Sequence, residues 1–233
     1  LVFLLFEYFQ KRRSNAVLKT KNDEISHEKT KSENLLLNIL PGTVAAELKE
    51  HGKTSSARHE IATVMFTDFQ GFTTFAEQNT PEEVVALLDY YFRAFDTIIS
   101  KYQIEKIKTI GDAYLCVSGV PTKNKDHAAN MIQAAMEFQA FMEVSTEQAQ
   151  LKMRIGIHTG PVVAGVVGSK KFAYDIWGDT VNIAARYEQT GEVGRINVSE
   201  TVVEATNGAF TFEYRGELEA KNKGKMKMFF VVG

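Results

Sequence analysis

Strand-like and helix-like segments mix irregularly from Ile61 to the C-terminus, and this mixture limits the possible folds more than any other feature of the sequence. The apolar run at 61–68, IATVMFTD, has the length and composition of a buried strand. Residues 81–101 instead carry apolar side chains at helical spacing, behind Thr80 as a cap and Pro81 in the first turn. Because the segments follow no strict strand–helix–strand repeat, we expect an α+β domain whose antiparallel-rich central sheet carries its helices on one face.

Turn signals divide the rest of this region into further elements. The Gly111–Asp112 pair predicts a tight turn between two short strands. A Gly160–Pro161 turn is expected to divide residues 152–168 into a second pair of strands. Asp179 is expected to cap a helix with the sequence DTVNIAARYEQ. The same reasoning predicts a helix over 126–143 and a C-terminal hairpin.

The N-terminal segment has the residue order found where a membrane helix leaves the bilayer. LVFLLF is too short to cross a bilayer, which takes roughly 20 apolar residues. Aromatic Tyr8 and Phe9 and then basic Lys11–Arg13 follow it. We therefore interpret residues 1–13 as the cytoplasmic end of a truncated transmembrane helix. In that case an upstream sensor or membrane region is missing, and the rest of the chain is tethered to the inner face of the plasma membrane. The alternative is an apolar helix start that packs on a partner.

Residues 14–52 are expected to form a helical linker. Three apolar residues share one heptad position, with Ser32 interrupting the series: Leu18, Ile25 and Ile39. This pattern fits either a short parallel coiled coil or a merely solvated helix. Pro41 and Gly42 break the pattern, and a short helix is then expected to end at Gly52.

Composition excludes several classes of protein. Hydrophobic residues make up 44% of the chain and charged residues 24%, which is typical of a globular protein with a substantial core. The net charge of -2 gives no reason to expect nucleic acid as a partner. Five scattered histidines and one cysteine form no zinc pattern, and no nucleophile elbow, Walker loop or dinucleotide fingerprint is present.

Two aspartates follow apolar strands that should hold them rigidly. Asp68 lies in FTDFQGFTTF and Asp112 in TIGDAYL. If they converge, their carboxylates suit a hard divalent cation such as Mg²⁺. Backbone N–H groups after Gly71 could also cradle phosphate oxygens. Each aspartate also has a structural explanation, as a helix cap for Asp68 and as a turn residue for Asp112.

Two further pairs could bind parts of a nucleotide. Asn182 and Arg186 lie four apart on one helix face, where an amide and a guanidinium suit a ribose and a phosphate. Lys108 and Asp175 interrupt apolar strands, so a donor and an acceptor there could recognise the edge of a base. The alternatives are a hydrogen-bonded surface pair and a structural salt bridge. The basic segment AKNKGKMK could hold a pyrophosphate or form a solvated turn.

Taken together, four segments resemble the class III nucleotide cyclase family: FTDFQGFT, KIKTIGDAYL, MRIGIHTGPVVAGVVG and YDIWGDTVNIAAR, in this order and at family-like spacing. The resemblance covers residues 60–233, and the helical segment LLNILPGTVAAELKEHG also resembles one that precedes bacterial members. It implies a ferredoxin-like α+β catalytic domain whose active sites form between two such domains.

The resemblance also implies a role for individual residues. Asp68, Asp112 and the backbone carbonyl of Phe69 would bind two divalent ions, Mg²⁺ or Mn²⁺. Phe72, Thr73, Arg154 and Lys221 would bind the phosphates. Lys108 and Asp175 would recognise adenine, Asn182 would orient the ribose, and Arg186 would stabilise the transition state.

With both halves of this set in one chain, the resemblance implies a head-to-tail homodimer that converts ATP to cyclic AMP and pyrophosphate. Two alternatives remain open. A guanylyl cyclase would typically have Glu at 108 and Cys at 175. A catalytically silent relative would lack a metal aspartate or the asparagine–arginine pair.

Overall fold

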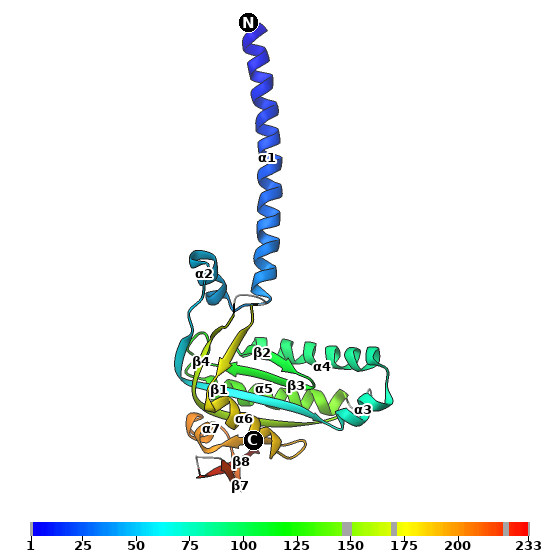
Figure 1. Ribbon diagram of the computed structural model, residues 1–233, viewed down its shortest axis with the longest axis vertical. Coiled ribbons are helices and arrows are strands. Elements are labelled where there is room, and N and C mark those ends of the chain that lie inside the picture. Colours follow the sequence, from blue (N-terminus) through cyan, green and yellow to red (C-terminus); the bar gives the residue numbers. More distant parts are fainter. Residues whose placement is uncertain (1, 146–150, 169–171, 221–223, 233) are drawn as a thin grey trace. The chain divides into compact units, whose positions relative to one another are not determined.

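The computed structural model describes residues 2–145, 151–168, 172–220 and 224–232, and the chain divides into two compact units, Leu1–Lys53 and Thr54–Gly233. Each unit is described by itself. The smaller, N-terminal unit is helical, and the larger unit contains one eight-stranded sheet with its helices (Figure 1).

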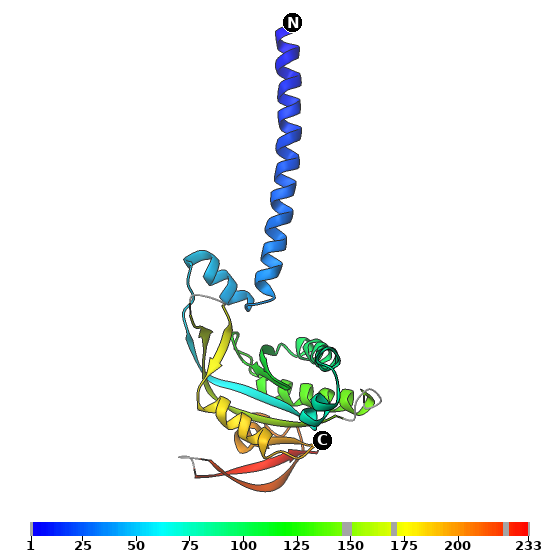
Figure 2. The same ribbon diagram turned by 45° about the vertical axis from the view of Figure 1, so that its right-hand side comes forward.

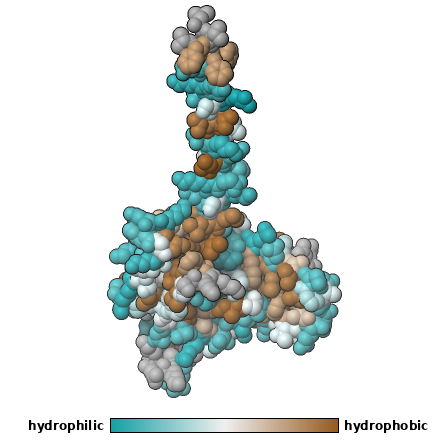
Figure 3. All heavy atoms as spheres, turned by 45° about the horizontal axis from the view of Figure 1, so that its top comes forward, coloured by the Kyte–Doolittle hydropathy of each residue, from teal (hydrophilic) through white to brown (hydrophobic). Residues whose placement is uncertain are grey.

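The N-terminal unit contains the helices α1 (Val2–Leu37) and α2 (Gly42–His51). The predicted end of the second helix is confirmed, because Gly52 caps it in the left-handed conformation with φ 68°. Apolar side chains interrupt the polar surface of α1 (Figure 3), among them the exposed Leu18 and Ile25. Among the described residues, no helix combines the length and the apolar composition that a membrane span needs.

The strand order of the sheet in the larger unit is β2-β3-β1-β4-β6-β8-β7, with β5 paired to β4. Neighbouring strands are antiparallel except for the parallel pair β4 and β6. The α+β class and the antiparallel-rich sheet are therefore confirmed. The strands are β1 (Ala57–Gln70), β2 (Glu105–Ile110), β3 (Ala113–Ser118), β4 (Lys152–Val166), β5 (Tyr174–Trp177), β6 (Ile196–Ser199), β7 (Phe212–Ala220) and β8 (Gly224–Val231).

The helices of this unit begin close to the predicted positions. For α4 the cause is visible: the Thr80 side chain accepts a hydrogen bond from the Glu83 backbone, and the Glu83 side chain returns one to Thr80, which forms a capping box. The helices are α3 (Phe72–Gln78), α4 (Pro81–Lys101), α5 (His127–Val144), α6 (Asp179–Gln189) and α7 (Glu200–Ala205). The residue that caps α6 is Gly178 rather than Asp179 as predicted, and Asp179 instead supplies negative charge to the first turn.

Helices cover both faces of the sheet, so the expectation that they lie on one face was wrong. On one face Met65 of β1 packs in a core with Phe95 of α4 and Phe138 of α5. On the other face lies α6 (Figure 2), where Tyr187 stacks on His158 of β4. The central strands bury side chains on both faces, and a sheet of this kind needs cover on both.

The strand β4 runs unbroken from Lys152 to Val166, whereas the sequence predicted two strands around a Gly160–Pro161 turn. Proline lacks the N–H that a sheet ladder needs, and it is tolerated in a strand at a bulge. The pairing of β4 with β1 shifts register at this point, between His59 and Ala62 of β1. The irregularity therefore accommodates Pro161 and lets the strand continue.

Candidate functional site

The face of the sheet that carries α6 also carries the first predicted metal-binding residue. Side chains alternate along β1, and Thr63 bonds to His127 of α5, so even-numbered positions such as Asp68 point to the α6 face. Asp68 is paired in register with Arg154 of β4, and an Arg154 terminal nitrogen lies 3.1 Å from an Asp68 carboxylate oxygen.

The second predicted metal-binding residue, Asp112, lies in the turn between β2 and β3. Gly111 precedes it with φ 62°, a conformation that glycine adopts without strain. Burial raises the pKa of Asp68, and the nearby negative charge of Asp112 raises it further, while Arg154 opposes the shift. Two carboxylates that repel each other in this way form a donor set that suits a hard cation. Among the described residues, no group of three or more acidic, histidine or cysteine side chains forms a metal site.

The sequence analysis missed Glu188, whose side chain is 8% exposed and lies in the same site. Its carboxylate accepts a hydrogen bond from Arg154 Nε at 2.8 Å. Burial raises the pKa of Glu188 to about 7, and the charges of Asp68 and Asp112 also raise it, against the opposing effect of Arg154. One guanidinium thus pairs with two carboxylates, those of Asp68 and Glu188.

Helical periodicity could have revealed Glu188. The buried positions of α6 include Ile183, Ala184, Tyr187 and Glu188, which recur at the spacing of one helix face. A carboxylate in such a stripe must have a buried partner. The partner is close because β4 has glycine at 156: a Cβ there would lie 1.9 Å from the backbone nitrogen of Glu188.

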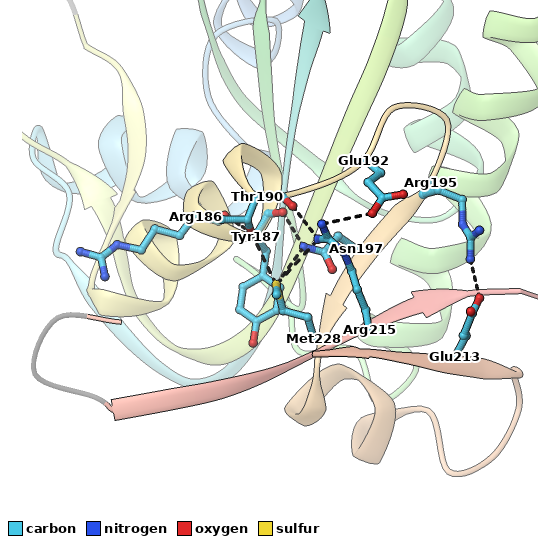
Figure 4. Close-up of polar contacts among 9 residues, drawn as sticks. All are labelled: Arg186, Tyr187, Thr190, Glu192, Arg195, Asn197, Glu213, Arg215 and Met228. Atoms are coloured by element: carbon cyan, nitrogen blue, oxygen red, sulfur yellow. Dashed lines mark hydrogen bonds and ion pairs between the residues drawn. The ribbon is translucent and has the colours of Figure 1, made fainter. Parts of the chain in front are cut away.

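The predicted ribose and transition-state residues lie on the outer side of α6. Asn182 is exposed and Arg186 partly exposed, one helical turn apart. Arg186 and Glu188 are two residues apart, which is roughly 200° around the helix axis. Glu188 points to Arg154 and the sheet, so Arg186 points away from them. Figure 4 shows the Arg186 side chain extending away from the contacts that hold the end of this helix.

These contacts, which we name the α6 clamp, fix the C-terminal turn of α6 (Figure 4). The side-chain amide of Asn197 on β6 donates to the Tyr187 carbonyl at 2.7 Å. Arg215 of β7 donates to the Thr190 carbonyl at 2.5 Å. The Tyr187 hydroxyl donates to the Lys227 carbonyl of β8 at 2.8 Å. The clamp therefore holds the turn that carries both Arg186 and Glu188.

The structure brings Lys108 and Asp175 together, although 67 positions separate them. Lys108 lies on β2, and its Nζ is 2.5 Å from a carboxylate oxygen of Asp175 on β5. The lysine side chain is 45% exposed and the aspartate side chain 19%, so the pair is accessible from solvent. A donor and an acceptor held this way can form hydrogen bonds with a flat polar ligand.

The remaining predicted residues lie near the end of β1, with one exception. Phe69 buries its side chain against Tyr91, with ring centres 5.1 Å apart, so only its backbone can contribute to the site. Gly71, with φ 85°, turns the chain into α3, where Phe72 packs on the core and Thr73 is exposed. Lys221 lies outside the described residues.

Comparisons with known proteins identify similar sequences and structures. Residues 54–233 match the family described as adenylate and guanylate cyclase catalytic domain. The chain is 40% identical over 230 residues to an adenylate cyclase of Mycobacterium tuberculosis, covering 95% of this chain and 49% of that protein. It is 41% identical over 213 residues to human atrial natriuretic peptide receptor 2, covering 88% of this chain and 20% of the receptor.

A solved structure has the same architecture. It is the catalytic core of a rhodopsin-guanylyl cyclase with converted specificity, in complex with ATPαS. The TM-score is 0.73 at 33% identity, covering 77% of this chain and 98% of that one. The chain spans about half the length of the mycobacterial relative and about a fifth of the receptor.

Proposed function

This chain belongs to the adenylate and guanylate cyclase catalytic domain family, and from that premise we propose that it converts ATP to 3′,5′-cyclic AMP and pyrophosphate. The Lys108–Asp175 pair is the observation that carries the choice of ATP. Lys108 can donate to a ring nitrogen of adenine, and Asp175 can accept from the amino group. Guanine presents an oxygen acceptor and an N–H donor on the same edge, so it fits this pair poorly.

Overall similarity does not decide between the two bases. The adenylate cyclase and the peptide receptor match this chain at nearly the same identity, 40% and 41%. The family pattern places Glu at 108 and typically Cys at 175 in guanylyl cyclases, and this chain has neither. The residues that would face the base therefore support adenine.

We propose that Asp68, Asp112 and the carbonyl of Phe69 hold two divalent cations, Mg²⁺ or Mn²⁺. The donor set fits: the carboxylates are hard oxygen ligands, and burial together with the neighbouring negative charge raises the pKa values of Asp68 and Glu188. When bound, such ions would lower the pKa of the ribose 3′-hydroxyl and neutralise the leaving phosphates.

The other proposed residues act by binding and orientation. The backbone at Phe72 and Thr73, the Arg154 guanidinium and Lys221 bind phosphate oxygens. Asn182 orients the ribose, which matters because the nucleophile and its target belong to one flexible molecule. Arg186 binds the α-phosphate as charge develops there, and a comparable arginine elsewhere contributes about 10³–10⁵ in rate.

We also propose that two copies of the chain share each site. Arg186 and Asn182 point away from the sheet face that carries Asp68, so one chain does not direct all of these groups at one nucleotide. A head-to-tail pair brings the outer side of α6 of one copy to the aspartates of the other. Exposed apolar side chains near the site, Ile110 beside the Asp112 turn and Trp177 on β5, would gain cover in such a pair.

Turnover with ATP and with GTP, in Mg²⁺ or Mn²⁺ and with products identified by mass, tests the proposal. We expect cyclic AMP and pyrophosphate from ATP and much slower formation of cyclic GMP. A preference for GTP would establish the guanylyl alternative. No product from either nucleotide, with folded protein, would establish a silent module.

A further inference from the structure

Two lysines of β2 lie two residues apart but point in different directions. Lys106 Nζ lies 2.8 Å from a carboxylate oxygen of Asp96 on α4. Lys108 Nζ lies 2.5 Å from the carboxylate of Asp175 on β5. In a regular strand, side chains two positions apart point to the same face. Something in β2 must therefore break the alternation.

The break is a β-bulge at Ile107. Lys106 is paired with Cys116 and Lys108 with Leu115, so two steps along β2 correspond to one step along β3. An extra residue of this kind reverses the alternation and increases the local twist. Cys116 belongs to the core under α4 and α5, and Leu115 points to the opposite face. The bulge thus sends the two lysines to opposite faces of the sheet.

The alternative for β2 is a regular register, without the bulge, in which each residue of β2 lies opposite one residue of β3. In that register Ile107 would lie opposite Cys116 and bury its side chain in the core. Lys106 would move to the face of Lys108 and bring a second ammonium group near Asp175. The bulged register leaves Ile107 only partly buried, so it needs an interaction that the regular register lacks.

Asp96 supplies that interaction. Its carboxylate accepts hydrogen bonds from Lys106 Nζ at 2.9 Å and from the Tyr114 hydroxyl at 2.6 Å. The ammonium group also lies 5.1 Å from the ring centre of Tyr114, in the range of a cation–π contact. In the strand order β2 is an edge strand that pairs with β3 along one edge. The contact between Lys106 and Asp96 therefore gives β2 a second attachment, to α4.

We propose that Lys106 and Asp96 are positioning residues for nucleotide selection: they hold the bulge that directs Lys108 to Asp175, and thereby set the preference for ATP over GTP. This inference rests on the proposed function, because that function assigns base recognition to Lys108 and Asp175. Lys106 faces α4 on the opposite side of the sheet, so its effect on the base must pass through Lys108.

The variant Lys106→Met tests the inference, because it removes the ammonium group and keeps an unbranched stem over Tyr114. The measurement is kcat/KM for ATP and for GTP on the full chain. We expect the ATP:GTP ratio to fall about tenfold, because a misaligned donor loses part of the discrimination that a paired polar group provides. Partial unfolding would lower both values equally and leave the ratio unchanged. Asp96→Asn tests the same contact from its other side and should lower the ratio too.

Two control variants separate positioning from general damage. Lys106→Arg keeps a cation within reach of Asp96 and should retain the parent ratio. Lys101→Met removes another ion pair of α4, Lys101 with Glu137 at 2.6 Å, and should leave the ratio unchanged.

The outcomes also separate this inference from the proposed function. A parent-like ratio in both Lys106→Met and Asp96→Asn would overturn the inference, as would an equal fall in Lys101→Met. If Lys108→Glu with Asp175→Cys still altered the preference, the proposed function would stand. A parent chain without any preference for ATP would overturn both.

Discussion

Lys108 and Asp175 are the two side chains that we propose distinguish one purine from the other. The double variant Lys108→Glu with Asp175→Cys reverses the donor and acceptor pattern that they present. We expect the ATP:GTP ratio of kcat/KM to fall by about a hundredfold or more, because polar groups that a bound base leaves without a partner discriminate strongly. Initial rates with each nucleotide measure it. Unchanged preference for ATP would remove the basis for assigning these two residues to the base.

Glu188 links the stability of the folded protein to pH. Its pKa in the folded protein is raised from an ordinary value of 4.5 to about 7, so the folded state favours the protonated carboxyl. Between pH 4.5 and pH 7 the carboxyl ionises in the unfolded protein but stays protonated in the folded protein, so the free energy of unfolding falls as the pH rises. Above pH 7 this contribution to stability is fully lost. Glu188→Gln stays neutral at every pH.

The stability of Glu188→Gln relative to the parent should therefore rise with pH. The gain from pH 4 to pH 8 should be a few kcal/mol at most, since one pKa unit is worth about 1.4 kcal/mol. Urea unfolding of both proteins at the two pH values measures the difference. A gap that stays constant across this range would show that Glu188 has an ordinary pKa in the folded protein.

Among the elements, α6 and β4 pack so closely that the strand has no room for a side chain at Gly156. A Cβ at Gly156 would overlap the backbone nitrogen of Glu188, so Gly156→Ala must push the helix away from the strand. We expect a loss of about 1–3 kcal/mol in the free energy of unfolding, together with reduced turnover. Gly42→Ala is the matched control, because its nearest contact would be 3.9 Å away. Equal stability of the two variants would contradict the close packing.

The role that we propose for helix α1 depends on a second chain. Its exposed Leu18 and Ile25 would be covered in a coiled coil, which would raise the local concentration of two catalytic units. Deleting residues 1–40 should then make specific activity depend more steeply on protein concentration. Sedimentation alongside the assay measures the dimer directly. If the shortened chain dimerises as well as the parent, the helix has no part in assembly.

How far the sequence predicted these elements depended on whether the signal was local. The capping residues of α4, the Gly111–Asp112 turn and the end of α2 were found, because each depends on a few adjacent residues. The continuity of β4 through Pro161 was missed, because a register shift in a distant strand compensates for the proline. Cover on the second face of the sheet was missed for the same reason, since it depends on where α6 packs.

For the candidate site, too, the sequence predicted the residues with a local signal and missed the features that depend on distant parts of the chain. The strand-end position of Asp68 and the pairing of Lys108 with Asp175 followed from charged residues within apolar segments. Glu188 was missed because it follows the functional motif, where an acid on a helix is normally solvated. The direction of Arg186 could not be read from its sequence neighbours, and it is this direction that supports the proposal of a site shared between two chains.

For the whole molecule, the proposed shared site makes a prediction about mixtures. In the proposed dimer, Asp68→Ala would remove a metal ligand from both sites of its homodimer, and Asn182→Ala would remove ribose positioning from both sites of its own. A heterodimer of the two has one site with both defects and one intact site. Since random exchange makes about half of the dimers mixed, activity should recover to about a quarter of the parent value in a closed two-fold dimer.

Co-expression with two different tags and isolation of the mixed species remove any doubt about subunit exchange. The matched control is a mixture of Asp68→Ala with Asp112→Ala, two variants whose defects lie in the same half of the site. Every site in that heterodimer contains one damaged aspartate, so no recovery is expected. An isolated Asp68→Ala and Asn182→Ala heterodimer that folds but stays inactive would exclude sites shared between chains.

The outward direction of Asn182 and Arg186 on α6 has a consequence for how the activity would depend on the concentration of the chain. In the proposed dimer one chain does not complete a site alone, so activity would depend on how often two copies meet. At concentrations well below the dimer dissociation constant, mass action makes halving the copies reduce the output to about a quarter. Anything that gathers chains in one place, such as a shared surface or a common scaffold, would then raise the signal without altering a single rate constant.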